Sequence, residues 1–267
     1  MTKLAFQNLA MIVTNQCNLN CDHCMRGTKN SEKMSEDVIK ATFKDTIAIS
    51  NLGICGGEPT LATDVIEYIF NYIIDNKIYL EDVSCVINGT IYSEEFLRLF
   101  DYINEYVKFI SKKSKVFFNI SYDRYHLKEV KERDLKEQYI DSIKKYQLSP
   151  YFRKLQELDF GKLFREGNSE KLSEDVTLNL EPMQIYLAYD KNIIGDLCNI
   201  GPLVTINTEG IITECDASII NQQTKYNYGN VLCDSIEDVM LKQGKVVSSH
   251  KWNRLTVKEI KRYQKYQ

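Results

Sequence analysis

Short apolar runs alternate with longer amphipathic stretches along this chain, and this alternation restricts the fold more than any other feature. The apolar runs predict strands at 9–14, 51–55, 82–87, 115–121 and 177–188. The amphipathic stretches predict helices at 35–47, 63–75, 93–110 and 128–146. Repeated strand–helix units are typical of βαβ folds, so the sequence predicts an α/β protein with a parallel sheet.

Residues suited to binding a ligand or a metal follow four of these predicted strands. They are Cys17 after the first strand, Gly56 and Glu58 after the second, Asn88 after the third, and Ser121 and Asp123 after the fourth. Parallel strands present their carboxyl ends at one edge of the sheet, and ligands bind there in α/β proteins. We therefore expect one functional site at this edge. An ordinary strand-end turn remains the alternative for Ser121 and Asp123.

Composition narrows the class of protein. The chain has 267 residues, of which 43% are hydrophobic and 27% charged, with a net charge of −3. This suits one large α/β domain with a small appendage, and it argues against disorder or general nucleic-acid binding. The first 20 residues lack a signal-peptide pattern, and no apolar run reaches 18 residues. We expect a cytoplasmic protein without a membrane span, whose eight cysteines are free, metal-bound or catalytic.

Three of those cysteines, Cys17, Cys21 and Cys24, have the spacing C-x3-C-x2-C. Thiolates are soft ligands for zinc, copper(I) or iron–sulfur clusters. A structural zinc site closes with four ligands, and no fourth Cys or His is placed to complete this set. Three cysteines on one loop suit three irons of a [4Fe–4S] cube, with the fourth iron open. A zinc knuckle or three core thiols are the alternatives, and Cys55 and Cys85 are expected to be core thiols.

This cysteine motif, with His23 before its last cysteine and "GGEP" after the second strand, resembles the radical S-adenosylmethionine (SAM) superfamily. The resemblance implies a partial (βα)6 TIM-like barrel over residues 1–190. It also implies that SAM binds the open iron of the [4Fe–4S] cluster. Reductive cleavage of SAM would then give a 5′-deoxyadenosyl radical that abstracts a substrate hydrogen. An electron donor such as flavodoxin or ferredoxin would be a partner.

The resemblance also implies roles for individual residues. Cys17, Cys21 and Cys24 would be the cluster ligands. The cofactor-binding residues would be His23, Gly56, Gly57, Glu58, Pro59, Asn88, Ser121 and Asp123. Among them, the "GGEP" edge would hold the SAM amino group, Pro59 would fix the turn, and Asn88 would face the methionine carboxylate. Ser121 and Asp123 resemble a ribose-contacting pair. "FREGNS" at 164–169 resembles the Gly-Arg-Ala segment of the family, with Arg165 as its arginine.

A second cysteine group lies in residues 191–267, where we expect a small extension with a β-hairpin and a helix. Cys198 and Cys215 flank a predicted hairpin with Gly210 at its turn, and Cys233 follows. This order resembles the SPASM or twitch extension of radical SAM enzymes, in its shorter form. Two alternatives stay open: Cys198, Cys215 and Cys233 hold a second [4Fe–4S] cluster, or the fold is kept without it. The basic tail from Lys245 is either a solvated helix face or a docking surface for an acidic peptide or redox partner.

The substrate is the least determined feature. Relatives with a twitch extension act on ribosomally made peptides, on sugars or cyclitols, and on nucleotides. We expect modification of a precursor peptide, presented by a separate recognition protein. A radical SAM dehydrogenase or rearrangement enzyme for a small molecule is the second hypothesis. A metal-stabilised binding module without turnover is the third.

Overall fold

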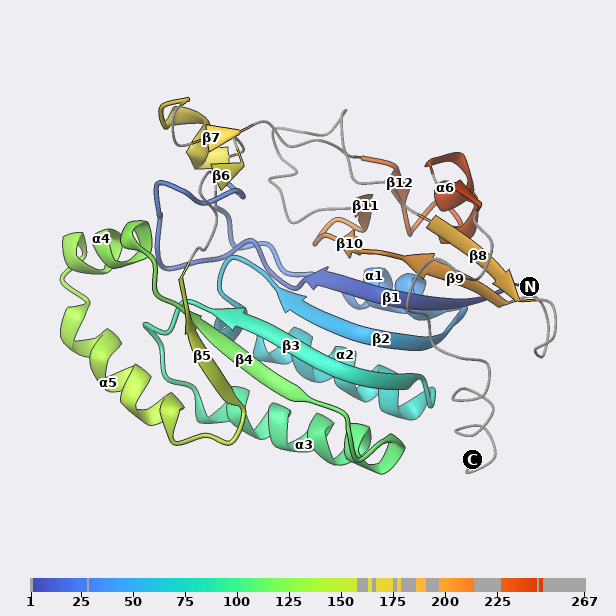
Figure 1. Ribbon diagram of the computed structural model, residues 1–267, viewed down its shortest axis with the longest axis horizontal. Helices are drawn as coiled ribbons and strands as arrows, with labels where there is room; N and C mark the ends of the chain where they lie inside the picture. Colours follow the sequence, from blue (N-terminus) through green and yellow to red (C-terminus); the bar gives the residue numbers. More distant parts are fainter. Residues whose placement is uncertain are drawn as a thin grey trace.

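Five parallel strands in chain order form the centre of the computed structural model (Figure 1). They are β1 (Lys3–Ile12), β2 (Thr46–Cys55), β3 (Tyr79–Ile87), β4 (Val116–Ser121) and β5 (Phe152–Gln156). The structure describes residues 2–27, 29–157, 163–164, 167–174, 177–178, 186–190, 197–213, 227–243 and 245–246. Over these ranges the sheet runs from β12 to β5 without closing. The predicted α/β fold is confirmed, as an open, partial barrel.

Three helices cover one face of this sheet (Figure 1). They are α1 (Glu36–Phe43), α2 (Thr63–Asp75) and α3 (Glu94–Ile110). Ser35 and Ser93 cap α1 and α3, since their side chains accept hydrogen bonds from the N–H groups of Val38 and Phe96. None of the helices in the described ranges is long and apolar enough to cross a membrane.

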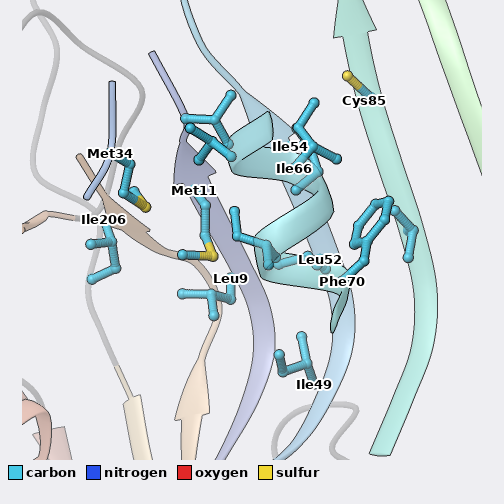
Figure 2. Close-up of a cluster of buried hydrophobic side chains, with 14 of the residues drawn as sticks. Leu9, Met11, Met34, Ile49, Leu52, Ile54, Ile66, Phe70, Cys85 and Ile206 are labelled. Atoms are coloured by element: carbon cyan, nitrogen blue, oxygen red, sulfur yellow. The ribbon is translucent and has the colours of Figure 1, made fainter. Parts of the chain in front are cut away.

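The main hydrophobic core lies between the sheet and these helices. Figure 2 shows Leu9 and Met11 of β1 and Leu52 of β2 packed toward Ile66 and Phe70 of α2, and all five are buried. Cys85 belongs to this core, as predicted, and is 2% exposed. Because neighbouring residues of a strand point to opposite faces, the residues between these core positions point to the face without helices. We call this side of β1–β5 the open face.

The prediction of a single helix over 128–146 is wrong. The structure has two helices there, α4 (Arg124–Glu132) and α5 (Lys136–Gln147). Asp134 separates them with a φ of 55°, in the left-handed region that an aspartate tolerates better than most residues. The linker contains neither glycine nor proline, so the helical pattern runs through it without a local stop signal.

Strands from the second half of the chain pair with the other edge of β1. β9 (Leu197–Gly201) lies beside Lys3–Phe6, and β10 (Val204–Ile206) lies beside Leu9–Met11, both parallel to β1. The predicted hairpin is present, because β10 pairs antiparallel with β11 (Ile211–Thr213) and Gly210 has a φ of 84°. The remaining described strands near this edge are β8 (Tyr186–Asp190), β12 (Gly229–Asn230) and β13 (Lys245–Val246).

Further short elements and one helix are β6 (Leu163–Phe164), β7 (Thr177–Leu178), the 3-10 helix η2 (Gly167–Lys171) and α6 (Ile236–Gln243). The strand expected at 177–188 is described only at its two ends, in β7 and the first part of β8. β8 and β9, from the two sides of the expected domain boundary at 190, pair with each other. The boundary itself stays a prediction, and the basic tail beyond residue 246 lies outside the described residues.

Candidate functional site

The loops that follow β1 and β2 are hydrogen-bonded to each other at the carboxyl edge of the sheet. The N–H of Gly57 donates to Thr14 O, and the N–H of Glu58 donates to Gln16 O, both at 2.7 Å. A Cβ atom on Gly57 would clash with Gln16 O, so only glycine allows the two backbones to approach this closely. The "GGEP" motif is therefore built into the start of the cysteine loop.

Glu58 is a fully buried acid that connects two strand ends. Its Oε1 accepts hydrogen bonds from the N–H and the hydroxyl of Thr60, at 3.1 and 2.6 Å, and it caps the 3-10 helix η1 (Pro59–Leu61). Its Oε2 accepts from the N–H of Asn88 at 2.6 Å. Burial raises the pKa of Glu58, and these hydrogen bonds lower it by less. The carboxyl group fixes the end of β3 relative to β2, and Pro59 begins η1, as a turn-fixing proline should.

Asn88, at the end of β3, connects that strand to the cysteine loop. Its Nδ2 donates to Asn18 Oδ1 at 2.8 Å and lies 3.8 Å from Cys17 Sγ. Its Oδ1 accepts from the N–H and the hydroxyl of Thr90. Asn88 therefore lies against the first cysteine of the motif, which was expected to be near the cofactor.

The three cysteines of the motif lie on one loop beyond β1. Cys21 is buried, and Cys17 and Cys24 are half-buried. Burial raises the pKa of the Cys21 thiol to about 12, Lys29 lowers it, and the neighbouring thiols Cys24 and Cys17 raise it further. Burial likewise raises the pKa of Cys17, with Lys29 as the main opposing charge. The three thiols are thus close enough to influence one another electrostatically.

Each of these sulfurs has a polar side chain beside it: one from the end of β3, one from α4 and one from the cysteine loop itself. Asn88 Nδ2 lies 3.8 Å from Cys17 Sγ, His126 Nδ1 lies 4.0 Å from Cys21 Sγ, and Lys29 Nζ donates to Cys24 Sγ at 3.5 Å. His126, on α4, is 2% exposed, and burial lowers its pKa to about 4. A neutral imidazole can donate or accept at Nδ1 depending on its tautomer, whereas the Lys29 ammonium can only donate.

His23 and Asp123 are brought together, as the site hypothesis requires. His23 Nε2 lies 3.5 Å from Asp123 Oδ2, and the imidazole stacks on Tyr125 with ring centroids 5.1 Å apart. Asp123 Oδ1 caps α4 by accepting from the N–H groups of Tyr125 and His126. Ser121 ends β4, and its carbonyl accepts a hydrogen bond from Tyr139. The helix cap gives Asp123 a structural role, and the cofactor-binding roles of His23, Ser121 and Asp123 stay predictions.

The "FREGNS" segment lies directly against the cysteine loop. The N–H of Asn168 donates to Cys24 O at 2.9 Å, and its Nδ2 donates to Cys21 O at 3.0 Å. Gly167 has a φ of 60°, and a Cβ atom there would clash with Met25 O. Arg165 lies outside the described residues. Within the described part of this segment, Gly167 and Asn168 contact the loop.

The second cysteine group is described only in part, since Cys215 lies outside the described residues. Cys198 is fully buried in β9, beside Leu4 of β1 and Tyr189 of β8. Cys233 is exposed, in the turn after β12. Across the described ranges, no group of three or more His, Cys, Asp or Glu side chains is gathered as ligands of a metal ion. The ligand roles of Cys17, Cys21, Cys24, Cys198, Cys215 and Cys233 stay predictions.

Sequence reasoning missed several residues that contact the cysteine loop, among them Lys29, Thr90, His126 and Asn168. Lys128 and Glu129 of α4 also contact it, at Asp22 Oδ2 and at the N–H of Asn20. Asn168 alone had a signal, because it lies in a segment already singled out by its resemblance. His126 comes three residues after the predicted site residue Asp123, which places it one helical turn into α4. Lys29 and Thr90 have common residue types in loops, and nothing in their spacing distinguishes them.

The sequence was also compared with known proteins. The family model described as "Radical SAM superfamily" matches residues 11–148. An uncharacterized protein, MJ0907, of Methanocaldococcus jannaschii is 36% identical over 73 residues, which are 26% of each chain. A probable GTP 3′,8-cyclase of Pyrococcus abyssi is 33% identical over 87 residues, 31% of this chain and 27% of that protein. This chain thus spans only about a quarter of the length of these curated relatives.

Among solved structures, similarity extends along most of the chain at low sequence identity. A structure titled "Native anSMEcpe with bound AdoMet and Cp18Cys peptide" covers 88% of this chain and 80% of its own, with 14% identity and a TM-score of 0.46. The structure of Streptococcus suis SuiB bound to the precursor peptide SuiA covers 88% of this chain and 65% of its own, with 13% identity and a TM-score of 0.41. Because the family model covers more than half of the chain, including the cysteine motif and the ends of the first four strands, this protein belongs to the radical SAM superfamily.

Proposed function

We propose that this chain abstracts a hydrogen atom from a ribosomally made peptide that binds on the open face of the sheet. The observation that carries the reaction type is the cysteine loop, whose three thiols lie at the carboxyl edge beside the ends of β2 and β3. When bound there, a [4Fe–4S] cluster and SAM supply the electron and the 5′-deoxyadenosyl radical that the superfamily uses. The chain's own residues hold the loops, orient the ligands and receive the substrate.

The donor set fits a [4Fe–4S] cluster. Three thiols on one loop are the soft ligands that iron–sulfur clusters take. Each has a side-chain nitrogen within 4.0 Å of its sulfur, and hydrogen bonds to cluster sulfurs are one of the ways in which proteins tune these groups. Cys17, Cys21 and Cys24 would hold the cluster.

The edge formed by Gly56, Gly57 and Glu58 would hold the amino group of SAM through backbone carbonyls, which the missing side chains leave accessible. In the structure both Glu58 oxygens already accept hydrogen bonds, so Glu58 would act by keeping Asn88 and the edge in place. Asn88 would face the carboxylate of SAM. Ser121, Asp123 and His23 would contact the ribose and adenine side of the ligand.

The open face carries a row of neutral amide and hydroxyl groups: Asn8, Asn51, Ser84, Asn119 and Gln156, which we call the amide row. Asn8 Nδ2 donates to Pro202 O at 2.6 Å, Asn51 Nδ2 donates to Asn8 Oδ1 at 3.2 Å, and Ser84 Oγ donates to Asn51 Oδ1 at 3.3 Å. Such groups match the N–H and C=O groups of a peptide backbone, which both donate and accept hydrogen bonds.

Asn119 extends the amide row to β4 and β5. Its neighbours Phe118 and Ile120 are buried in the core, so Asn119 points to the open face. Its Nδ2 donates to Gln156 Oε1 at 3.0 Å, whereas its Oδ1 is buried and has no hydrogen-bond partner among the described residues. A buried acceptor without a partner costs free energy, and a substrate N–H would satisfy it. This asparagine supports an amide-bearing substrate.

A nucleotide is the second candidate substrate. Its support is the local similarity to probable GTP 3′,8-cyclases of several archaea, at 33% identity over 87 residues in Pyrococcus abyssi and over 100 residues in Methanococcus maripaludis. Those matches cover about a third of this chain and a third or less of each relative. The cyclase activity therefore stays a hypothesis here.

One set of anaerobic incubations separates these candidates. Reconstituted protein, dithionite and SAM are mixed with short peptides encoded beside the gene, with GTP, or with neither, and 5′-deoxyadenosine and product masses are measured. We expect 5′-deoxyadenosine in all three and a mass change in one peptide only. Asn119→Leu should reduce peptide modification and leave SAM cleavage without peptide unchanged. Conversion of GTP with unmodified peptides would favour the second candidate, and no 5′-deoxyadenosine at all would exclude both.

A further inference from the structure

Lys29 differs from the other two side chains beside the cysteine sulfurs because it alone of the three carries a permanent charge. Its Nζ donates to Cys24 Sγ at 3.5 Å and to Leu19 O at 2.8 Å. Leu19 lies between Cys17 and Cys21 and is 2% exposed. The ammonium group therefore bridges the first and last parts of the cysteine loop.

The position of this charge is fixed by its two contacts. Lys29 is half-buried, and Leu19 belongs to the main hydrophobic core, so the accepting carbonyl has little freedom to move. The two contacts lie on either side of Cys21 in the sequence, because Leu19 precedes it and Cys24 follows it. One cation is thus held inside the loop that carries the three candidate ligands.

We propose that Lys29 is a positioning residue that raises the reduction potential of the [4Fe–4S] cluster held by Cys17, Cys21 and Cys24. This inference rests on the cluster of the proposed function. Reduction transfers one electron from an external donor to the cluster, which gains one negative charge while no bond forms or breaks. A cation held near one sulfur stabilises the reduced cluster more than the oxidised one, and charge and hydrogen bonds at the sulfurs set such potentials.

The charge of Lys29 can be removed while its length is kept. Lys29→Met removes both the charge and the donor, Lys29→Gln removes the charge and keeps a donor, and Lys29→Arg keeps the charge. Lys33→Met is the matched control, because Lys33 lies four residues away, is partly exposed and pairs with Asp64 Oδ1 at 2.7 Å instead of with a thiol. Each full-length protein is reconstituted with iron and sulfide under anaerobic conditions.

The measurement is a potentiometric titration followed by the electron paramagnetic resonance signal of the reduced cluster. At a fixed potential, we expect the ratio of reduced to oxidised cluster to fall about tenfold in Lys29→Met and Lys29→Gln, which is about 59 mV for one electron. Lys29→Arg should restore most of the ratio, and Lys33→Met should not change it. Only molecules with a cluster give the signal, so a variant with lower iron content is still measured correctly.

Two results would overturn the inference. One is an unchanged ratio in both Lys29→Met and Lys29→Gln. The other is an equal fall in Lys29→Arg, which would show that the shape of lysine, and not its charge, is what the loop requires. Failure of the wild-type protein to bind iron would instead refute the cluster itself, and with it the proposed function. The two failures are therefore distinguishable.

Discussion

The N–H of Asn88 donates a hydrogen bond of 2.6 Å to Glu58 Oε2, which ties the end of β3 to the motif that follows β2. Glu58→Gln would present an NH2 group to one of the three donors that converge on this side chain. A buried donor left without a partner costs about 1–3 kcal/mol. We expect SAM to bind roughly ten- to a hundredfold more weakly to the reconstituted variant, with the iron content unchanged. Equilibrium binding of SAM measures this effect.

Glu67→Gln is the control for this substitution, because Glu67 is exposed on α2. It should leave SAM affinity at the wild-type value. An affinity for SAM that is also unchanged in Glu58→Gln would limit Glu58 to a role in folding.

The same carboxyl group predicts a pH dependence. Burial raises the pKa of Glu58 above its ordinary value of 4.5, so the folded protein keeps this proton to a higher pH than the unfolded chain does. The resulting stabilisation is present below about pH 4.5 and is lost as the pH rises through the folded-state pKa. Since glutamine does not titrate, the unfolding free energy of wild type minus that of Glu58→Gln should decrease as the pH rises from 4.5. Urea unfolding of both proteins over this range tests it, and a constant or growing difference would contradict the prediction.

Gly167→Ala should loosen the contact between η2 and the cysteine loop. The new Cβ would meet Met25 O, and the φ of 60° is strained for alanine, so we expect a loss of more than about 1 kcal/mol. Gly53→Ala is the control, since its Cβ would meet only ordinary contacts at 3.6 Å and beyond. Urea unfolding and hydrogen exchange of residues 21–25 measure the effect. Equal unfolding free energies of the two variants would show that glycine is not required where residue 167 contacts the cysteine loop.

Replacement of Cys17, Cys21 and Cys24 by Ala should remove the iron of the main cluster and abolish formation of 5′-deoxyadenosine. The sheet should remain folded, because two of the three side chains are only half-buried. Cys85→Ala is the control: this thiol lies in the core, so the variant should lose some stability and keep its iron. Iron assay and circular dichroism separate the two effects. A triple variant that still cleaves SAM would disprove the ligand assignment.

Iron content also decides between one cluster and two. Two four-iron clusters require about eight irons per chain, and the second-cluster hypothesis predicts a fall to about four when Cys198 and Cys215 are replaced by Ala. Cys233→Ala should give the same fall if this exposed thiol is the third ligand. About four irons in the native reconstituted protein would refute the second cluster. Cys198 would then be a core thiol, in agreement with its burial in β9.

The first half of the fold was predictable because its signals are local. Helix α2 begins and ends where the apolar spacing predicts, and α3 begins at a serine cap that the sequence displays. The break between α4 and α5 was not predictable, since a left-handed Asp134 leaves the helical pattern of its neighbours intact. The position of β9 beside the start of β1 was equally hidden, because strand partners separated by almost 200 residues leave no spacing signal in one sequence.

For the candidate site, strand position predicted that Asn88 and Cys17 lie at one edge of the sheet, and Asn88 does lie beside Cys17. The sequence did not predict which hydrogen bonds each polar side chain makes. The two Glu58 oxygens accept hydrogen bonds from Thr60 and Asn88, and Asp123 caps a helix. In both cases a buried acceptor binds the nearest backbone donors that the fold offers. Lys29 was missed for the opposite reason: nothing in the sequence distinguishes this loop lysine, yet its Nζ donates to Cys24 Sγ.

The placement of β1 inside the sheet has a consequence for how the chain is made. β1 leaves the ribosome before its partner strands, and its partner on one side, β2, follows within a few dozen residues. Its other edge pairs with β9 and β10, so it waits for residues near 206. At about 5–20 residues per second, that edge stays without its partner for roughly 10–40 seconds. During synthesis the nascent protein therefore carries an open strand edge, and binding of a chaperone to this edge would protect it until translation reaches the hairpin.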